Sequence, residues 1–267
     1  MFTITFSPAW FYGIDIFIDI ISIIVLCLIA FFSFKYYLLD KSSNYFFLTF
    51  SFLLIAASFF FKILTNFTIY YDVLHTQNVG FFSMTYQTLQ QSDLLFTVGY
   101  YLFRLLTLFG FLILYSITKK QSVSTFLIIS FLFIMLNYFA QNAFTVFHAT
   151  CFVMLFFITL NYFEKYRESK RRTTLLLMIS FAIIAVSQII FYCMKFDEIF
   201  YAVAEIVQLF GYVLLLITFV MILLYGHKIN YLDIKKIRSE YKDKIKKQLG
   251  SVIKKKGFSN GTKKDKT

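Results

Sequence analysis

The chain has 267 residues, of which 59% are hydrophobic and 15% are charged, and its formal net charge is +12 at neutral pH. Soluble globular domains contain about 25% charged residues, so this composition excludes an ordinary soluble domain. Apolar stretches of about 20 residues recur along the chain, and that length crosses the hydrocarbon core of a bilayer. The stretches do not alternate with period two, so they predict an all-α integral membrane protein.

Seven apolar stretches predict a seven-transmembrane helix bundle that occupies residues 1–227, followed by a tail over residues 228–267. No proline interrupts any of the stretches, because the single proline of the chain is Pro8. We expect the spans at about 12–36, 44–66, 94–118, 122–140, 142–163, 173–195 and 199–226.

Basic residues gather in the connections that follow the odd-numbered spans. Lys35 and Lys41 flank the first connection, residues 119–120 are both lysine, and residues 165–172 include five Lys or Arg. The long connection over residues 67–93 contains no Lys or Arg. Because positively charged connections stay in the cytoplasm, we expect the N-terminus outside the cell and the C-terminus in the cytoplasm. The expected location is the plasma membrane.

The tail carries most of the net charge. From residue 227 onward it has 14 Lys and Arg against 4 Asp and Glu, which accounts for +10 of the total of +12. Apolar residues recur there at three- and four-residue steps, which predicts an amphipathic helix to about residue 256 and a disordered end. Such a helix is expected to lie on the anionic lipids of the inner leaflet. The candidate membrane-surface residues are Lys235, Lys236, Arg238, Lys242, Lys246 and Lys247.

Two pairs of segments resemble each other and suggest an internal duplication. Residues 100–115 align without gaps with residues 201–216, and residues 51–63 align with residues 180–192. Spans 1–3 would then repeat as spans 5–7 with span 4 between them, which is a 3+1+3 parallel repeat. Gly110 aligns with Gly211, and both are candidate helix-packing positions.

Ionisable and amide side chains lie inside the predicted spans, close to the ends that should face outside. An ionised side chain at the bilayer centre costs about 2.5–3.5 kcal/mol, so such residues are candidates for function. Arg104 aligns with Glu205 in the repeat, and we expect these two to pair across an outward-facing polar pocket. The candidate ligand-binding or polar-core residues are Arg104, Glu205, Asp19, His148, Asp15 and Gln188.

A purely structural interpretation of the same residues remains open. The buried polar groups could pair only to hold the helices in register. Asp15, Asp19 and Lys62 lie near span ends, so they could instead extend toward the outer membrane surface.

The sequence favours a non-enzymatic membrane protein. It contains no His-Glu-x-x-His pattern, its three Cys and three His residues show no metal-ligand spacing, and we therefore expect neither an enzyme nor a metal site. No cofactor is expected. Retinal in particular is disfavoured, because a retinal-binding lysine would be needed in span 7 and residues 199–226 contain none.

The Phe- and Lys-rich multi-span pattern resembles uncharacterised prokaryotic, archaeal-type seven-span membrane proteins of sensor-like organisation, and the sensing regions of histidine kinases. Seven helices with an external N-terminus also resemble receptor and rhodopsin topology, and together with the outward-facing polar pocket this predicts a receptor or sensor that binds an unknown small ligand. A small solute transporter is the alternative, because the three-one-three arrangement resembles the SWEET family, although the proline-glutamine motif of that family is absent. A non-catalytic scaffold subunit is the second alternative.

The expected partners are the lipid bilayer and a cytoplasmic protein; nucleic acid is not expected.

Overall fold

The structure, a computed structural model, describes residues 8–75, 89–119, 121–139 and 143–222. The predicted basic tail therefore lies outside the described residues. Residues up to Val220 belong to one compact unit, and a second unit begins at Met221.

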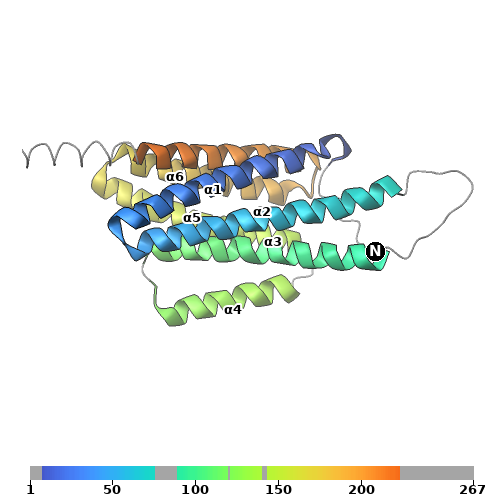
Figure 1. Ribbon diagram of the computed structural model, residues 1–267, viewed down its shortest axis with the longest axis horizontal. Coiled ribbons are helices and arrows are strands. Elements are labelled where there is room, and N and C mark those ends of the chain that lie inside the picture. Colours follow the sequence, from blue (N-terminus) through green and yellow to red (C-terminus); the bar gives the residue numbers. More distant parts are fainter. Residues whose placement is uncertain (1–7, 76–88, 120, 140–142, 223–267) are drawn as a thin grey trace, which may run out of the picture. The chain divides into compact units, whose positions relative to one another are not determined.

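Seven α-helices make up nearly all of the described chain (Figure 1), and the described residues contain no strand. A short 3-10 helix, Ala9–Phe11, precedes them. The helices are α1 (Ile14–Asp40), α2 (Ser43–His75), α3 (Leu89–Thr118), α4 (Val123–Phe139), α5 (Ala143–Ser169), α6 (Arg172–Cys193) and a final helix, Ile199–Ile222.

The length and composition of the helices confirm a multi-pass helical membrane protein. Among the described residues, six helices are long and apolar enough to cross a bilayer, and α4 is a shorter apolar helix. With 17 residues, α4 is about 26 Å long, somewhat less than a hydrocarbon core of about 30 Å. The structure thus has the seven predicted helices, of which six meet the full length of a span.

Two helices extend well beyond their predicted spans. The expected second span ends at residue 66, whereas α2 continues to His75, and the expected third span begins at residue 94, whereas α3 begins at Leu89. The apolar parts of these helices, Ser43–Phe67 and Phe96–Thr118, agree with the prediction. Hydropathy marks the edge of the membrane, and a helix can continue into water where no Pro or Gly stops it.

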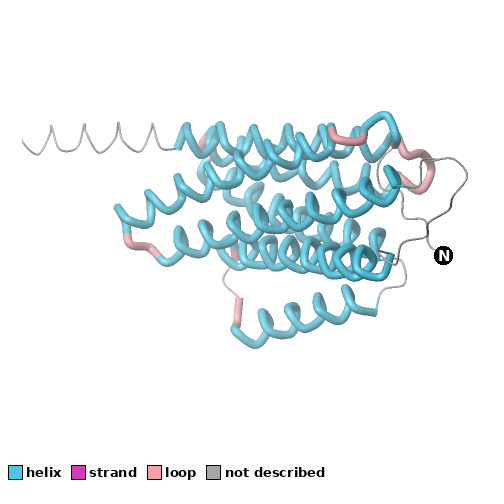
Figure 2. Tube along the Cα trace, turned by 45° about the vertical axis from the view of Figure 1, so that its right-hand side comes forward, coloured by secondary structure: helices cyan, strands magenta, loops and turns pink. Residues whose placement is uncertain are grey.

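Consecutive helices pack in pairs, and α4 is the exception. Among α1 to α6, the α1–α2, α2–α3 and α5–α6 pairs have the most extensive contacts, whereas the contacts of α4 with α3 and α5 are smaller. Figures 1 and 2 both show the α4 ribbon apart from the other six. Much of its apolar surface is uncovered, including Leu127 (61% exposed) and Phe131 (56%). Such a surface suits contact with lipid.

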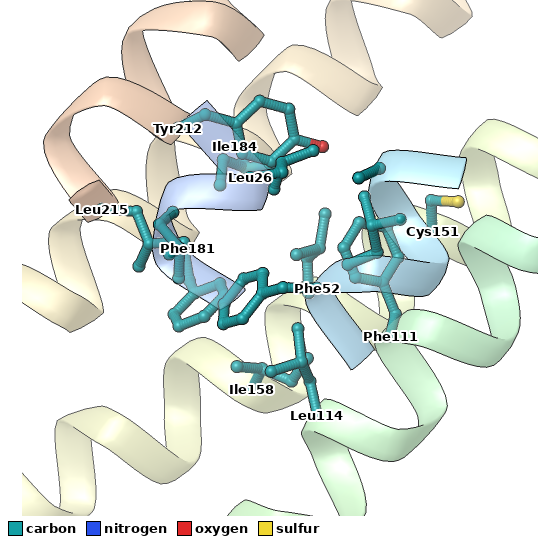
Figure 3. Close-up of a cluster of buried hydrophobic side chains, with 14 of the residues drawn as sticks. Leu26, Phe52, Phe111, Leu114, Cys151, Ile158, Phe181, Ile184, Tyr212 and Leu215 are labelled. Atoms are coloured by element: carbon teal, nitrogen blue, oxygen red, sulfur yellow. The ribbon is translucent and has the colours of Figure 1, made fainter. Parts of the chain in front are cut away.

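An apolar core fills the centre of the bundle. Figure 3 shows side chains from α1, α2, α3, α5, α6 and the final helix directed toward one another, among them Leu26, Phe52, Leu114, Ile158 and Tyr212. Phe52 contacts the ring of Phe219 edge-on with centroids 5.7 Å apart, which ties α2 to the final helix.

Two glycines allow helices to approach closely at similar points. A Cβ added to Gly110 of α3 would lie 2.5 Å from Cγ1 of Ile55 in α2. A Cβ added to Gly211 of the final helix would lie 2.5 Å from Cγ1 of Ile184 in α6. The hydroxyl of Ser51 also donates a hydrogen bond of 3.1 Å to the carbonyl oxygen of Gly110. Both glycines therefore stand at helix–helix contacts, and each fixes the rotation of its helix against a neighbour.

Candidate functional site: a buried lysine between two carboxylates

Lys62 of α2 is the centre of the buried charged cluster. Its Nζ donates a hydrogen bond of 2.8 Å to Oδ1 of Asp19 in α1, and it also donates to Oε1 of Glu205 in the final helix. Asp19 is 0% exposed, Glu205 is 1% exposed and Lys62 is 8% exposed. One ammonium group therefore joins α1 and α2 to the final helix of the bundle.

The cluster holds two carboxylates for one ammonium group, so it carries one surplus negative charge when all three side chains are ionised. Oδ2 of Asp19 is buried and accepts no hydrogen bond within the described part of the chain. A buried carboxylate is costly unless its charge and lone pairs are satisfied. The site is thus able to accept a hydrogen bond from a further donor.

Asp15 lies one turn before Asp19 and is held at the start of α1. The helix follows Gly13, whose φ of 86° is accessible to glycine at little cost. Oδ1 of Asp15 accepts hydrogen bonds from the backbone N–H groups of Gly13 (3.1 Å) and Ile16 (2.8 Å). Its Oδ2 accepts a hydrogen bond of 3.2 Å from Nδ2 of Asn66, which lies one turn after Lys62 on α2. This second contact supports the α1–α2 pairing.

His148 and Gln188 form a neutral pair between α5 and α6. Nδ1 of His148 donates to Oε1 of Gln188 at 2.8 Å, and both side chains are buried. Aromatic rings surround the imidazole: Phe191 stacks on it with centroids 4.5 Å apart, and Phe144 lies edge-on at 4.3 Å. The pair is therefore held rigidly in an apolar setting.

A small cavity of about 40 Å³ lies between the lysine cluster and the histidine pair. It is lined by residues of α2, α3, α5, α6 and the final helix, so it joins the first and last parts of the bundle. Its volume accommodates one to a few water molecules. The polar lining residues are Lys62, Thr65, Asn66, Tyr100, Thr107, His148, Gln188, Tyr201 and Gln208.

The expected Arg104–Glu205 pair is wrong. Glu205 accepts its hydrogen bond from Lys62, and Arg104 places its guanidinium carbon 4.4 Å from the ring centroid of Tyr100. Nε of Arg104 donates to the carbonyl oxygen of Tyr100 at 3.4 Å. Arg104 lines a separate groove together with residues of α4, so it does not join the cluster. Alignment in a repeat makes two positions equivalent, but equivalent positions need not face each other.

The structure places the other five candidates around Lys62 and the cavity. Asp19 and Glu205 bind the lysine directly, Asp15 is one helical turn from Asp19, and His148 with Gln188 lines the opposite wall. Sequence reasoning treated Lys62 as a residue that could extend to the membrane surface, and so missed its central role. The available signal was that Lys62 is the single basic residue within residues 44–66.

The helices and the buried charges together define the class of this protein: a polytopic helical membrane protein with a polar cluster inside its bundle. Comparison of the chain with protein families, with curated proteins and with solved structures gives no match. Within the described residues, no group of three His, Cys, Asp or Glu side chains could hold a metal ion.

Proposed function

We propose that the protein is a receptor- or sensor-like membrane domain that binds a small polar ligand in the cavity beside Lys62. The observation that carries the proposal is the position of the lysine cluster, which closes one side of a cavity lined by five helices. Buried ionisable groups in membrane proteins commonly mark ligand or ion sites. The proposal is non-catalytic and needs no cofactor.

The size of the cavity supports a mechanism. At about 40 Å³, it is far smaller than the 300–1,000 Å³ of ordinary ligand pockets. A ligand larger than a few waters can therefore enter only if helices separate, and Lys62 ties α1, α2 and the final helix together at this point. A ligand that competes for one of the carboxylates would release a helix, and that movement would carry the signal.

The proposed orientation of the chain in the membrane rests on the distribution of its basic residues. We place the N-terminus outside and the C-terminus inside at the plasma membrane, so that the cavity opens outward and the basic tail contacts anionic inner-leaflet lipids. Movement of the helices would be transmitted to the tail and, through the tail, to a cytoplasmic protein partner.

A small solute transporter is the second candidate, and the glycine contacts favour it. The Gly110–Ile55 and Gly211–Ile184 contacts occupy aligned positions of the two repeat segments. Ser58 and Ser187, which also align, each donate a 2.7 Å hydrogen bond to the carbonyl oxygen three residues earlier. These matches support the 3+1+3 repeat, and a cavity between two such halves suits alternating access. A scaffold subunit has no specific observation in its favour.

Cysteine accessibility separates the three candidates. Gln208 lines the cavity, and Leu215 lies seven residues later on the same helix face, within the apolar core. Gln208→Cys and Leu215→Cys would be made in a chain whose three native cysteines are replaced by alanine. Each variant would then be treated in oriented vesicles with a membrane-impermeant thiol reagent from either side.

A receptor predicts that Gln208→Cys reacts from the outside alone, whereas a transporter predicts reaction from both sides. Leu215→Cys should not react from either side and serves as the matched control. If Gln208→Cys stays as unreactive as Leu215→Cys from both sides even on prolonged exposure to the reagent, the helices do not separate at the cavity, and the ligand-binding proposal is wrong in favour of the scaffold.

A further inference from the structure

A second site of different chemistry lies on the outside of the bundle, around Arg104. A groove of about 610 Å³ runs between α3, α4 and the start of α5, and Arg104 forms part of its wall. Val98 of α3 and Tyr138 of α4 also line it and are 48% and 73% exposed. The contacts of α4 with α3 and α5 beside this groove are less extensive than those of the α1–α2, α2–α3 and α5–α6 pairs.

Arg104 has a positive charge without a carboxylate partner in the described part of the chain. The ion pairs there are both made by Lys62. Arg104 is 6% exposed, and its contacts are the ring and the backbone carbonyl of Tyr100. A guanidinium group has five N–H donors, and the Nε–H is the one directed at the carbonyl. The remaining donors are available to an anion.

The Arg104 side chain extends from within the third span toward the end of the bundle where α3 begins. Arg104 is ten residues after position 94, where the predicted third span begins, so its Cα is about 15 Å further along the helix. Helical side chains point toward the N-terminal end of their helix, and the hydrogen bond to the carbonyl of Tyr100 shows that Arg104 does so. The guanidinium therefore reaches back by about one turn toward the membrane surface.

We propose that the groove binds an anionic phospholipid, with the phosphate on Arg104 and an acyl chain between α3 and α4. Guanidinium groups bind phosphate oxygens in a bidentate manner, and such charge-assisted bonds are stronger than neutral ones. The exposed ring of Tyr138 is typical of the membrane interface, where aromatic side chains lie at headgroup level. This inference is independent of the cavity beside Lys62, because Arg104 is not among the residues that line that cavity.

Lipid binding to the full-length protein tests the proposal. Native mass spectrometry would measure the affinities for phosphatidylglycerol and for phosphatidylcholine of the same acyl chains, with inorganic phosphate as a competitor. Arg104→Gln removes the charge, and Arg167→Gln is the matched control, because Arg167 is an exposed arginine in the last turn of α5. Val98→Trp fills the groove without a change in charge.

We expect Arg104→Gln to weaken phosphatidylglycerol binding about tenfold, while Arg167→Gln changes it less than twofold. Val98→Trp should weaken the binding of both lipids, and it decides the question if Arg104→Gln does not fold. The proposal is overturned if wild-type protein binds the two lipids equally, or if Arg104→Gln binds phosphatidylglycerol as wild type does. Displacement of the lipid by millimolar inorganic phosphate would assign the site to a free anion and overturn it as well.

Discussion

Replacement of Lys62 by methionine would leave two buried carboxylates facing each other without the ammonium group that they share. Methionine has a similar length, so the change removes the charge and two hydrogen bonds with little loss of volume. Removing one partner of a buried ion pair costs about 3–5 kcal/mol, since the other charge is left uncompensated. Because Lys62 serves both Asp19 and Glu205, we expect Lys62→Met to lower the free energy of unfolding by an amount near the top of that range.

The assay is reversible unfolding in mixed micelles, followed by circular dichroism as the fraction of denaturing detergent increases. Lys35→Met provides the matched control, since Lys35 is an exposed lysine on α1. Its substitution should change the free energy of unfolding by less than about 0.5 kcal/mol.

A charge-neutral variant separates electrostatics from packing. Lys62→Met combined with Asp19→Asn and Glu205→Gln removes all three charges at once, and replacement of a complete buried ion pair is often neutral. We expect this triple variant to recover most of the stability lost in Lys62→Met. If Lys62→Met costs no more than Lys35→Met, or if the triple variant is no more stable than Lys62→Met, the cluster does not tie the helices together as described.

The remaining predictions concern helix packing and topology. Gly110→Ala should destabilise the bundle by about 1–3 kcal/mol, because the new Cβ would lie 2.5 Å from Cγ1 of Ile55. The added Ile55→Ala change should relieve part of that clash. If the effects of the two substitutions on the free energy of unfolding simply add, the contact is contradicted. For topology, Asn78→Cys should react with an impermeant thiol reagent outside intact cells, whereas Glu168→Cys should react only after the membrane is opened, and outside labelling of position 168 would reverse the orientation.

The apolar runs were sufficient to predict the helices, and the polar residues within them included several members of the buried cluster. In lipid, each span must satisfy its own backbone hydrogen bonds, so a run of about 20 apolar residues forms an α-helix. For the same reason, polar residues near equivalent span ends are expected to share a layer of the bundle. Asp19, Glu205, His148 and Gln188 indeed line or flank one cavity.

Which of those polar side chains meet was decided by the tertiary structure, because it depends on how each helix is rotated about its axis. Arg104 and Gly110 are six residues apart, and so are Glu205 and Gly211, which turns each charge about 120° away from its glycine. Gly110 packs on α2, and Arg104 faces the groove beside α4. Gly211 packs on α6, and Glu205 faces Lys62. The apolar runs of the sequence determined the helices, whereas the packing at two glycines determined which partner each charged side chain meets.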